Sequence, residues 1–331
     1  MKSTIFSFFF GLLLFNPFFS EAYPPLEPYE PNTHFNECRI TEQNGKYGIS
    51  LGNQLVVPCE YDEILPQHTT FFKVRKNRKY GLIHYYYSKN KRNICHTACH
   101  IVPFRKGYVT LQPTLACEYD EISDYRDNFL RITRGHQTGI LNYYGSVVIP
   151  CRYEKAELQD NHFWVEAQGK QGIYNRYGSV IIPVRYTAIE ETSEYYLVEQ
   201  GKLKGIINRY GSVLIPCRYT LVRNEGKSFY VEDNGQCGIY NLYGSVVIPC
   251  RFDEIRRIDK RYFVRQNKSY GVYNQYGSVV LPCRFSKIEC LANGQLVAIS
   301  QGKWQLYNAY GSLLGEYGDS EVIYSTEETT D

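Results

Sequence analysis

NYYGSVVIPCRY, residues 142–153, is a phrase that returns along the chain at a fixed interval. Its later copies begin at Asn175, Asn208, Asn241, Asn274 and, in a weaker form, Asn308. The step between full copies is 33 residues, as from residue 142 to residue 175. Such a period is typical of repeat proteins, in which each unit buries its apolar face against its neighbours. The phrase therefore predicts one continuous array rather than two separate domains in these 331 residues.

The segment 172–204 illustrates how one unit is expected to fold. Gly172–Asn175 is predicted to be a short strand, followed by a type I turn with a glycine bulge over Asn175–Gly178, because glycine adopts positive φ without steric cost. Ser179–Ile182 is the predicted return strand. Pro183 is expected to end it, because proline cannot donate a ladder hydrogen bond.

The rest of the unit is predicted to be an irregular connection over Arg185–Thr192 and a third strand over Glu194–Gln200. Ile173, Val180 and Ile182 are expected to join a core shared between units. The predicted fold class is all-β: tandem repeats of about 33 residues whose short antiparallel strands stack in an open twisted array. A closed propeller-like ring is the alternative, and three strands per unit fall short of a four-stranded propeller blade.

The flanking segments differ in composition from the repeats. Residues 1–22 combine Lys2, an apolar run and small residues before position 23, which is typical of a secretory signal peptide; a retained N-terminal anchor is the alternative. Residues 23–35 form a Pro-rich linker. The repeat domain is predicted over 36–314, with an insertion at about 84–115, and residues 315–331 read as an acidic tail.

The order of short motifs resembles the WG-repeat (KWG-repeat) family of bacterial proteins. The best matches are GKYGI at 45–49, VVPCEYDEI at 56–64 and KYGL at 79–82. The family's Trp position is occupied here by other residues except at Trp304, and it is expected to be exposed. The resemblance implies an all-β repeat body and no general catalytic activity.

Six of the eleven cysteines share one repeat position, which Val184 fills in one unit: Cys59, Cys117, Cys151, Cys217, Cys250 and Cys283. Interchange with Val favours small, buried thiols. A disulfide ladder suited to an oxidising compartment is the alternative. The cysteines outside this position are the better candidates for bridges: Cys38, Cys95, Cys99, Cys237 and Cys290.

A second set of repeated side chains consists of arginines, each followed by Tyr or Phe: Arg152, Arg185, Arg218, Arg251 and Arg284. Such a row is a candidate site for an acidic glycan, because guanidinium groups bind carboxylates and stack on rings. The structural interpretation is that each arginine packs over the neighbouring ring or pairs with a carboxylate such as Glu154 or Asp253.

The insertion contains the candidate metal ligands Cys95, His96, Cys99 and His100. Their residue types suit a soft metal ion, and their spacing differs from the c-type haem motif by one residue. A local Cys95–Cys99 bridge or a plain hairpin tip is the alternative.

Composition and motifs together favour an exported, non-catalytic protein of the periplasm, outer membrane or exterior. The net charge of +3 without a long basic run gives no reason to expect nucleic acid. No catalytic motif stands out, no cofactor is expected, and no second apolar run is long enough to span a membrane. The expected partner is another envelope protein, with an acidic glycan or a role in adhesion as the alternative. A metal-binding insertion, or an enzyme whose site forms from distant loops, is the remaining alternative.

Overall fold

The structure is a computed structural model that describes residues 34–67, 71–89 and 101–318. The chain divides into two compact units. Unit 1 comprises residues 1–74 and 83–113, and unit 2 comprises residues 75–82 and 114–331. Across the described residues the chain is almost entirely β-strand, which confirms the predicted fold class.

The first strands form two sheets. A three-stranded sheet has the order β1-β2-β3 and a five-stranded sheet the order β4-β5-β6-β8-β7. Their bounds are β1 Cys38–Gln43, β2 Lys46–Leu51, β3 Gln54–Tyr61, β4 Glu63–Gln67, β5 Phe71–Lys76, β6 Lys79–Ser88, β7 Ile101–Phe104 and β8 Gly107–Tyr119. A 3-10 helix, η1 Phe35–Glu37, precedes them. In unit 1, Phe35 of η1 stacks on Phe72 and meets Tyr85 edge-on.

The insertion lengthens an ordinary hairpin and adds a strand. β6 and β8 have 10 and 13 residues, whereas the corresponding β15 and β16 have six and seven. β7 pairs with β8 at the sheet edge. The extra residues thus extend an existing sheet.

Unit 2 contains six four-stranded antiparallel sheets within its described residues. In chain order their strands are β9 Glu121–Tyr125, β10 Phe129–Arg134, β11 Gln137–Leu141, β12 Val147–Tyr153; β13 Lys155–Gln159, β14 His162–Ala167, β15 Lys170–Asn175, β16 Val180–Tyr186; β17 Ala188–Glu191, β18 Tyr195–Gln200, β19 Leu203–Asn208, β20 Val213–Tyr219; β21 Leu221–Asn224, β22 Ser228–Asp233, β23 Gln236–Asn241, β24 Val246–Phe252; β25 Glu254–Ile258, β26 Arg261–Gln266, β27 Ser269–Asn274, β28 Val279–Phe285; β29 Lys287–Cys290, β30 Leu296–Ser300, β31 Lys303–Tyr307 and β32 Leu313–Tyr317. A second 3-10 helix, η3 Arg126–Asn128, joins β9 to β10.

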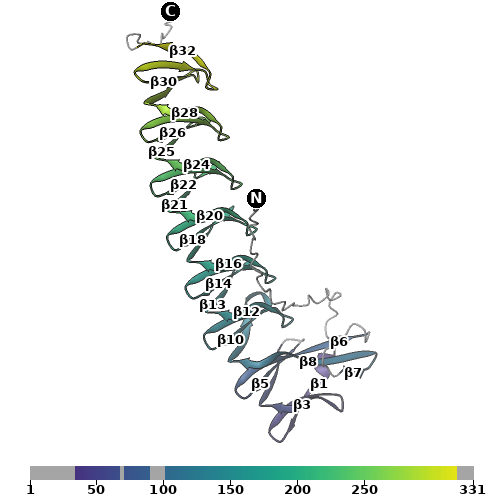
Figure 1. Cartoon of the computed structure of the whole chain (residues 1–331). Coiled ribbons are helices and arrows are strands. Elements are labelled where there is room, and N and C mark those ends of the chain that lie inside the picture. Colours follow the sequence, from purple (N-terminus) through teal and green to yellow (C-terminus); the bar gives the residue numbers. More distant parts are fainter. Residues whose placement is uncertain (1–33, 68–70, 90–100, 319–331) are drawn as a thin grey trace, which may run out of the picture. The chain divides into compact units, whose positions relative to one another are not determined.

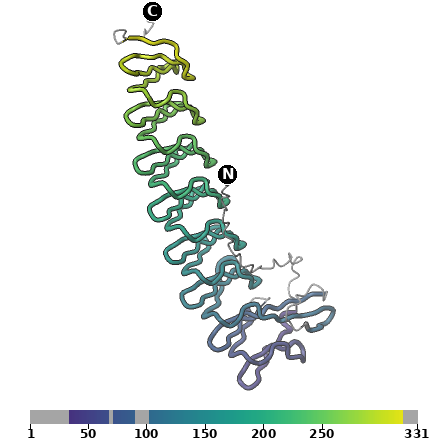
Figure 2. The backbone as a smooth tube through the Cα atoms, in the orientation of Figure 1, coloured from purple at the N-terminus to yellow at the C-terminus, as the bar shows by residue number. Residues whose placement is uncertain are grey.

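The sheets of unit 2 follow one another in an open stack, as expected, and not in a ring (Figure 1). The tube in Figure 2 shows the same backbone path repeated from sheet to sheet. The expectation of three strands per unit was wrong, because the connection after Tyr186 contains β17, which pairs with β18. Four strands per sheet are therefore compatible with an open array.

Pro183 lies within β16 and does not end it. The pairing of β15 with β16 shifts between Gln171↔Tyr186 and Ile173↔Ile182, so the segment 183–185 bulges opposite Gly172. A bulge is a position where proline is tolerated in a sheet. An added Cβ on Gly172 would lie 2.8 Å from the carbonyl oxygen of Ile182, so the bulge requires glycine at this position.

The apolar core lies between consecutive sheets. One buried cluster joins Ile173 and Ile182 of the β13–β16 sheet to Tyr196, Val198 and Ile207 of the β17–β20 sheet. Equivalent clusters link the other neighbouring sheets. A single sheet leaves this face uncovered, so each unit depends on its neighbour.

The turn glycines bring neighbouring sheets into close contact. Gly178, Gly211 and Gly244 have φ of +87°, +91° and +86°. A Cβ on Gly211 would lie 2.5 Å from the carbonyl oxygen of Ile181, and one on Gly244 would lie 2.6 Å from that of Leu214. Each turn therefore rests on a strand of the preceding sheet, and only glycine permits both the backbone angle and the approach.

The last strand extends past the expected end of the repeat domain. β32 includes Gly315, Glu316 and Tyr317, and Glu316 pairs with Lys303 at 2.9 Å. The residues predicted as a signal peptide and almost all of the Pro-rich linker lie outside the described residues, as do residues 319–331 of the tail. Among the described residues no helix has the length and apolarity needed to cross a membrane.

Replacing Gly244 with Ala is expected to destabilise unit 2 by about 3 kcal/mol, from left-handed backbone strain and overpacking against Leu214. Gly226 is a matched control, because its φ is +83° and an added Cβ would meet no atom within 4 Å. Gly226→Ala should cost only about 1 kcal/mol. Urea denaturation of both variants measures the difference, and equal midpoints would contradict the close approach.

Candidate functional site

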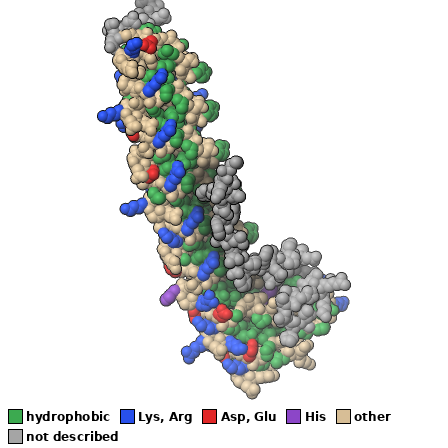
Figure 3. Space-filling view, in the orientation of Figure 1, with side chains coloured by type: hydrophobic (Ala, Val, Ile, Leu, Met, Phe, Trp, Pro, Cys, Tyr) green, Lys and Arg blue, Asp and Glu red, His purple; other side chains and the backbone are tan. Residues whose placement is uncertain are grey.

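A row of exposed tyrosines is the most prominent surface feature of unit 2. Each occupies the third position of a turn, and the exposed fraction of these residues ranges from 80% to 92%. This turn-tyrosine row consists of Tyr177, Tyr210, Tyr243, Tyr276 and Tyr310. Figure 3 shows hydrophobic side chains projecting at intervals along one edge of unit 2, while Lys and Arg side chains follow a separate line.

The backbone of each turn is held without help from the tyrosine ring. In one turn, the Asn175 side-chain oxygen accepts hydrogen bonds from the N–H groups of Tyr177 and Ser179, both at 2.9 Å. The Gly178 N–H donates to the Asn175 carbonyl oxygen at 3.1 Å, as expected for the predicted turn. Asn, Gly and Ser satisfy the turn, so the fold places no requirement on the ring.

The valine that follows each turn is exposed, contrary to the expectation that Val180 is buried. The exposed residues are Val147, Val180, Val213, Val246, Val279 and, in the last unit, Leu313, at 50% to 55%. The cause is a second register shift, because Ile182 pairs with Ile173 but Val180 pairs with the adjacent residue Tyr174. Neighbouring strand residues face opposite sides of a sheet. The valines therefore add exposed apolar area shortly after each turn.

The five predicted arginines pack over rings while remaining exposed. The guanidinium carbon lies 4.8–5.3 Å from the ring centroid of the following Tyr or Phe in all five cases, Arg152, Arg185, Arg218, Arg251 and Arg284. This arrangement matches the structural interpretation of the sequence. Glu154 and Asp253 instead accept hydrogen bonds from the backbone N–H groups of Gln168 and Asn267.

Three of these arginines also contribute to a contact between consecutive sheets. Tyr219 at the end of β20 and Tyr240 of β23 share a hydroxyl hydrogen bond of 2.7 Å, with their rings edge-on at 5.8 Å. Arg218 donates to both hydroxyls, at 2.6 Å and 3.5 Å. Burial, followed by the bond to Tyr240, raises the pKa of Tyr219, so the Tyr219 hydroxyl stays protonated. Arg152 and Arg251 make corresponding bonds to Tyr174 and Tyr273.

None of the nine cysteines that the structure describes forms a disulfide. Cys38, Cys237 and Cys290, which were the better candidates for bridges, form none, and the described cysteines of the repeated position form no ladder of disulfides. Their side chains cover the strand glycines, because an added Cβ on Gly205 would lie 3.0 Å from Cys217 Sγ and one on Gly172 would lie 2.6 Å from Val184. This shared role explains the interchange of Cys and Val.

The position that holds Trp in WG repeats is half-buried in most units rather than exposed as predicted. Cys237 is 1% exposed, and its thiol donates to the carbonyl oxygen of Phe252 at 3.1 Å. Trp304 and Gln171 are half-buried. Gln171 pairs with the buried Tyr186 of the bulged strand, as Cys237 does with Phe252, which limits the exposure of both residues.

The predicted metal ligands Cys95, His96, Cys99 and His100 lie outside the described residues. Within residues 34–67, 71–89 and 101–318, no three His, Cys, Asp or Glu side chains gather in a way that would hold a metal ion. The turn tyrosines were not among the predicted site residues. Their sequence signal is an aromatic ring at a turn position where the turn itself requires none.

Comparison with known proteins supports the repeat assignment. Two segments, residues 238–268 and residues 270–304, match the family described as WG containing repeat, which confirms the resemblance inferred from the sequence. These segments extend from β23 to β31. No curated protein matches the chain.

Several solved structures show a low similarity to this chain. Hsv2p of Kluyveromyces lactis is 10% identical, with a TM-score of 0.22 over 78% of this chain and 99% of that chain. AztD of Citrobacter koseri is 8% identical, with a TM-score of 0.23 over 86% and 94%. PorZ of Porphyromonas gingivalis, a component of its type-IX secretion system, is 8% identical, with a TM-score of 0.23 over 80% of this chain and only 38% of PorZ.

The packed thiols lead to a prediction about reactivity. Burial is the main cause that raises the pKa of Cys217, Cys250 and Cys283 above the ordinary value of 9.0. Because the thiolate is the reactive form, alkylation at pH 8 should be at least about tenfold slower in the folded chain than in urea. Mass spectrometry of the modified peptides measures both rates, and equal rates would contradict the packing.

The raised pKa of these thiols also determines how the stability of the fold changes with pH. The folded chain keeps these thiols protonated at a pH where the unfolded chain ionises them. The contribution of these thiols to the free energy of unfolding is complete below their pKa in the unfolded chain, near 9.0. It is lost as the pH rises through their higher pKa in the folded chain. The urea concentration at the unfolding midpoint should therefore decrease as the pH is raised above 9. The Cys217→Val variant should show a smaller decrease.

Proposed function

Because it carries WG-containing repeats, we propose that this chain is an exported, non-catalytic protein that binds another protein of the cell envelope through its turn-tyrosine row. The observation that carries the proposal is the exposure of five tyrosines whose rings the fold does not use. Tyrosine is enriched at protein interfaces, because its ring buries a large apolar area while its hydroxyl remains able to hydrogen-bond.

The backbone beneath the row favours binding. Each turn of the row from Gly178 onward rests on the preceding sheet through its glycine, and its Asn side chain fixes the loop. A surface that is ordered before binding loses less conformational entropy on association. The exposed valines, each three residues after a turn tyrosine, supply further exposed apolar area in the same segment.

We include export in the proposal because of the composition of residues 1–22. Their charged start, apolar run and small residues near position 22 are typical of a signal peptide. A mature chain that begins near Tyr23 would present the tyrosine row in the periplasm, at the outer membrane or outside the cell. The expected partner is then a protein of the same compartment.

A photo-crosslinking amino acid placed at Tyr210 or Tyr276 in intact cells of the source organism is expected to give discrete protein adducts. The same amino acid at Lys202, which lies at the opposite end of the β17–β20 sheet, is the control. Ser in place of the other turn tyrosines should reduce the adducts. Adducts of equal yield from Lys202, or none from the row, would contradict the proposal, as would an uncleaved N-terminus.

An acidic glycan along the arginine row is a second candidate, favoured by the exposure of all five arginines. Arg218→Ala combined with Arg251→Ala should then weaken retention on a column of acidic polysaccharide by about tenfold, as expected for losing two exposed ionic contacts. The control is Lys202→Ala combined with Lys227→Ala, which removes the same charge from turns outside the arginine row. Unchanged retention in the arginine variant would remove this candidate.

A further inference from the structure

The residue after the turn Asn differs from turn to turn in unit 2. Arg176 occupies this position in one turn, where its guanidinium carbon lies 5.4 Å from the ring centroid of Phe129. Its Nη1 lies 3.0 Å from the carboxylate of Asp127. Phe129 and Asp127 belong to the preceding sheet and its connecting 3-10 helix, so the arginine crosses the space between two sheets.

The next turn has an arginine at the same position. The guanidinium carbon of Arg209 lies 4.9 Å from the ring centroid of Tyr196, and the group pairs with Glu191. It also donates to the carbonyl oxygen of Thr192 at 3.0 Å. In both turns, therefore, the side chain after Asn places a guanidinium on an aromatic ring and against a carboxylate.

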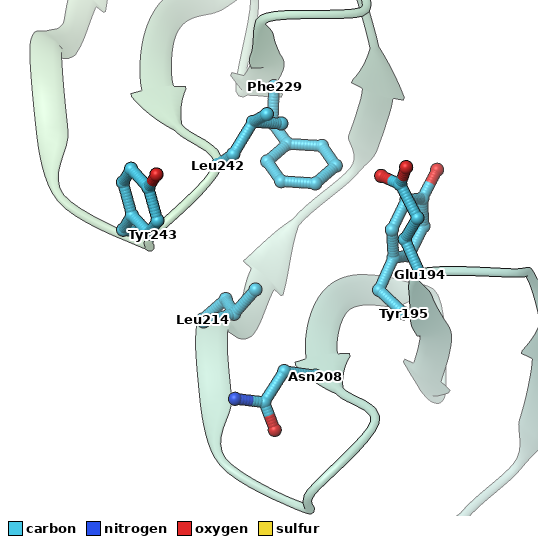
Figure 4. A pocket seen from close by; sticks show the side chains of 7 residues that line it. All are labelled: Glu194, Tyr195, Asn208, Leu214, Phe229, Leu242 and Tyr243. Carbon is cyan, nitrogen blue, oxygen red and sulfur yellow. The ribbon is translucent and has the colours of Figure 1, made fainter.

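Leu242 replaces arginine in the following turn, and a cleft of about 380 Å³ is present there between the β17–β20 and β21–β24 sheets. Figure 4 shows Leu242 and Tyr243 on one side of the cleft and Glu194 and Tyr195 on the other. Phe229 and Leu214 complete its apolar lining. A leucine is too short and too apolar to reach the carboxylate as an arginine would.

The cleft contains an aromatic ring and a carboxylate, the two kinds of group that hold the arginines of the two preceding turns, although this carboxylate lies at a different repeat position. Tyr195 meets Phe229 edge-on at 5.2 Å, and its hydroxyl accepts a hydrogen bond from Asn224 at 3.2 Å, which fixes the ring. Glu194 stands beside Tyr195 and, unlike Asp127 in the arginine-filled turn, forms no salt bridge with any residue that the structure describes. A ring and a carboxylate are thus in place without a cation.

We propose that this cleft binds an arginine side chain of the partner protein. The aliphatic part of the side chain would lie along Leu214 and Leu242, and its guanidinium would stack on the aromatic lining and face Glu194. A planar guanidinium suits this combination better than an ammonium group does. An acidic glycan is disfavoured here, because Glu194 repels its carboxylates. The inference rests on the proposed function, since Tyr243 belongs to both the row and the cleft.

The test uses the full chain with ¹³C-methyl-labelled leucine and a Gly/Ser peptide of twelve residues with one central arginine. Titration should shift the methyl signals of Leu214 and Leu242 in a saturable manner, with a Kd of about 1 mM for a single contact. The same peptide with citrulline, a neutral isostere, should bind about tenfold more weakly. No shift, or equal binding of the citrulline peptide, would overturn the proposal.

Three variants test whether the arginine peptide binds in this cleft. Leu242→Arg restores the residue found in the two preceding turns, so it should fold normally, fill the cleft and abolish the shift of Leu214. Gln275→Arg makes the same change of charge in the next turn and should leave binding unchanged. Glu194→Gln should weaken binding about fivefold through loss of the charge pair. Wild-type binding by a folded Leu242→Arg variant would overturn the proposal.

The two proposals can fail separately. If crosslinks from Tyr210 and Tyr276 form but the arginine peptide does not bind, the row is an interface and the cleft is not an arginine site. If the peptide binds at the cleft and no crosslinks form, the proposed interface along the row fails instead.

Discussion

The structure of unit 2 depends on the contact between a turn glycine and the backbone of the preceding sheet. At Gly178, Gly211 and Gly244 this contact combines a positive φ with an approach that leaves no room for a Cβ. It fixes the distance and direction of the step from sheet to sheet, and the Ile and Val side chains then fill the space between them. Because the same contact repeats, each turn projects at an equivalent place in the open stack.

This constraint divides the residues into those that the array requires and those that can vary without affecting it. Asn, Gly and Ser hold the turn, and the arginine–aromatic pair and the packed thiol hold the bulged strand. The turn itself requires neither the tyrosine nor the residue before it, which allows the latter position to carry Arg176, Arg209 or Leu242 in successive turns. Binding specificity in this protein would then arise from substitutions at positions that the backbone does not require.

The sequence was sufficient for the period, the turn and the core residues Ile173 and Ile182, because a repeated Asn, Gly and Ile report backbone geometry directly. It was insufficient for β17, whose four residues show no clear alternation and depend on pairing with β18. Val180 and Pro183 were misplaced because of two register shifts in a single strand. One shift creates the bulge that tolerates Pro183, and the other changes the face that Val180 presents. The cleft beside Leu242 was not predictable, since it requires knowing which residues of two sheets meet.

The central claim is that the turn-tyrosine row is a contact surface. Chemical labelling of tyrosine, quantified by mass spectrometry in the purified protein and in intact cells of the source organism, tests it most directly. The account predicts that Tyr177, Tyr210, Tyr243, Tyr276 and Tyr310 are all modified in the purified protein and are protected in cells, because a partner covers them. Equal modification of these five residues in both samples would contradict the account.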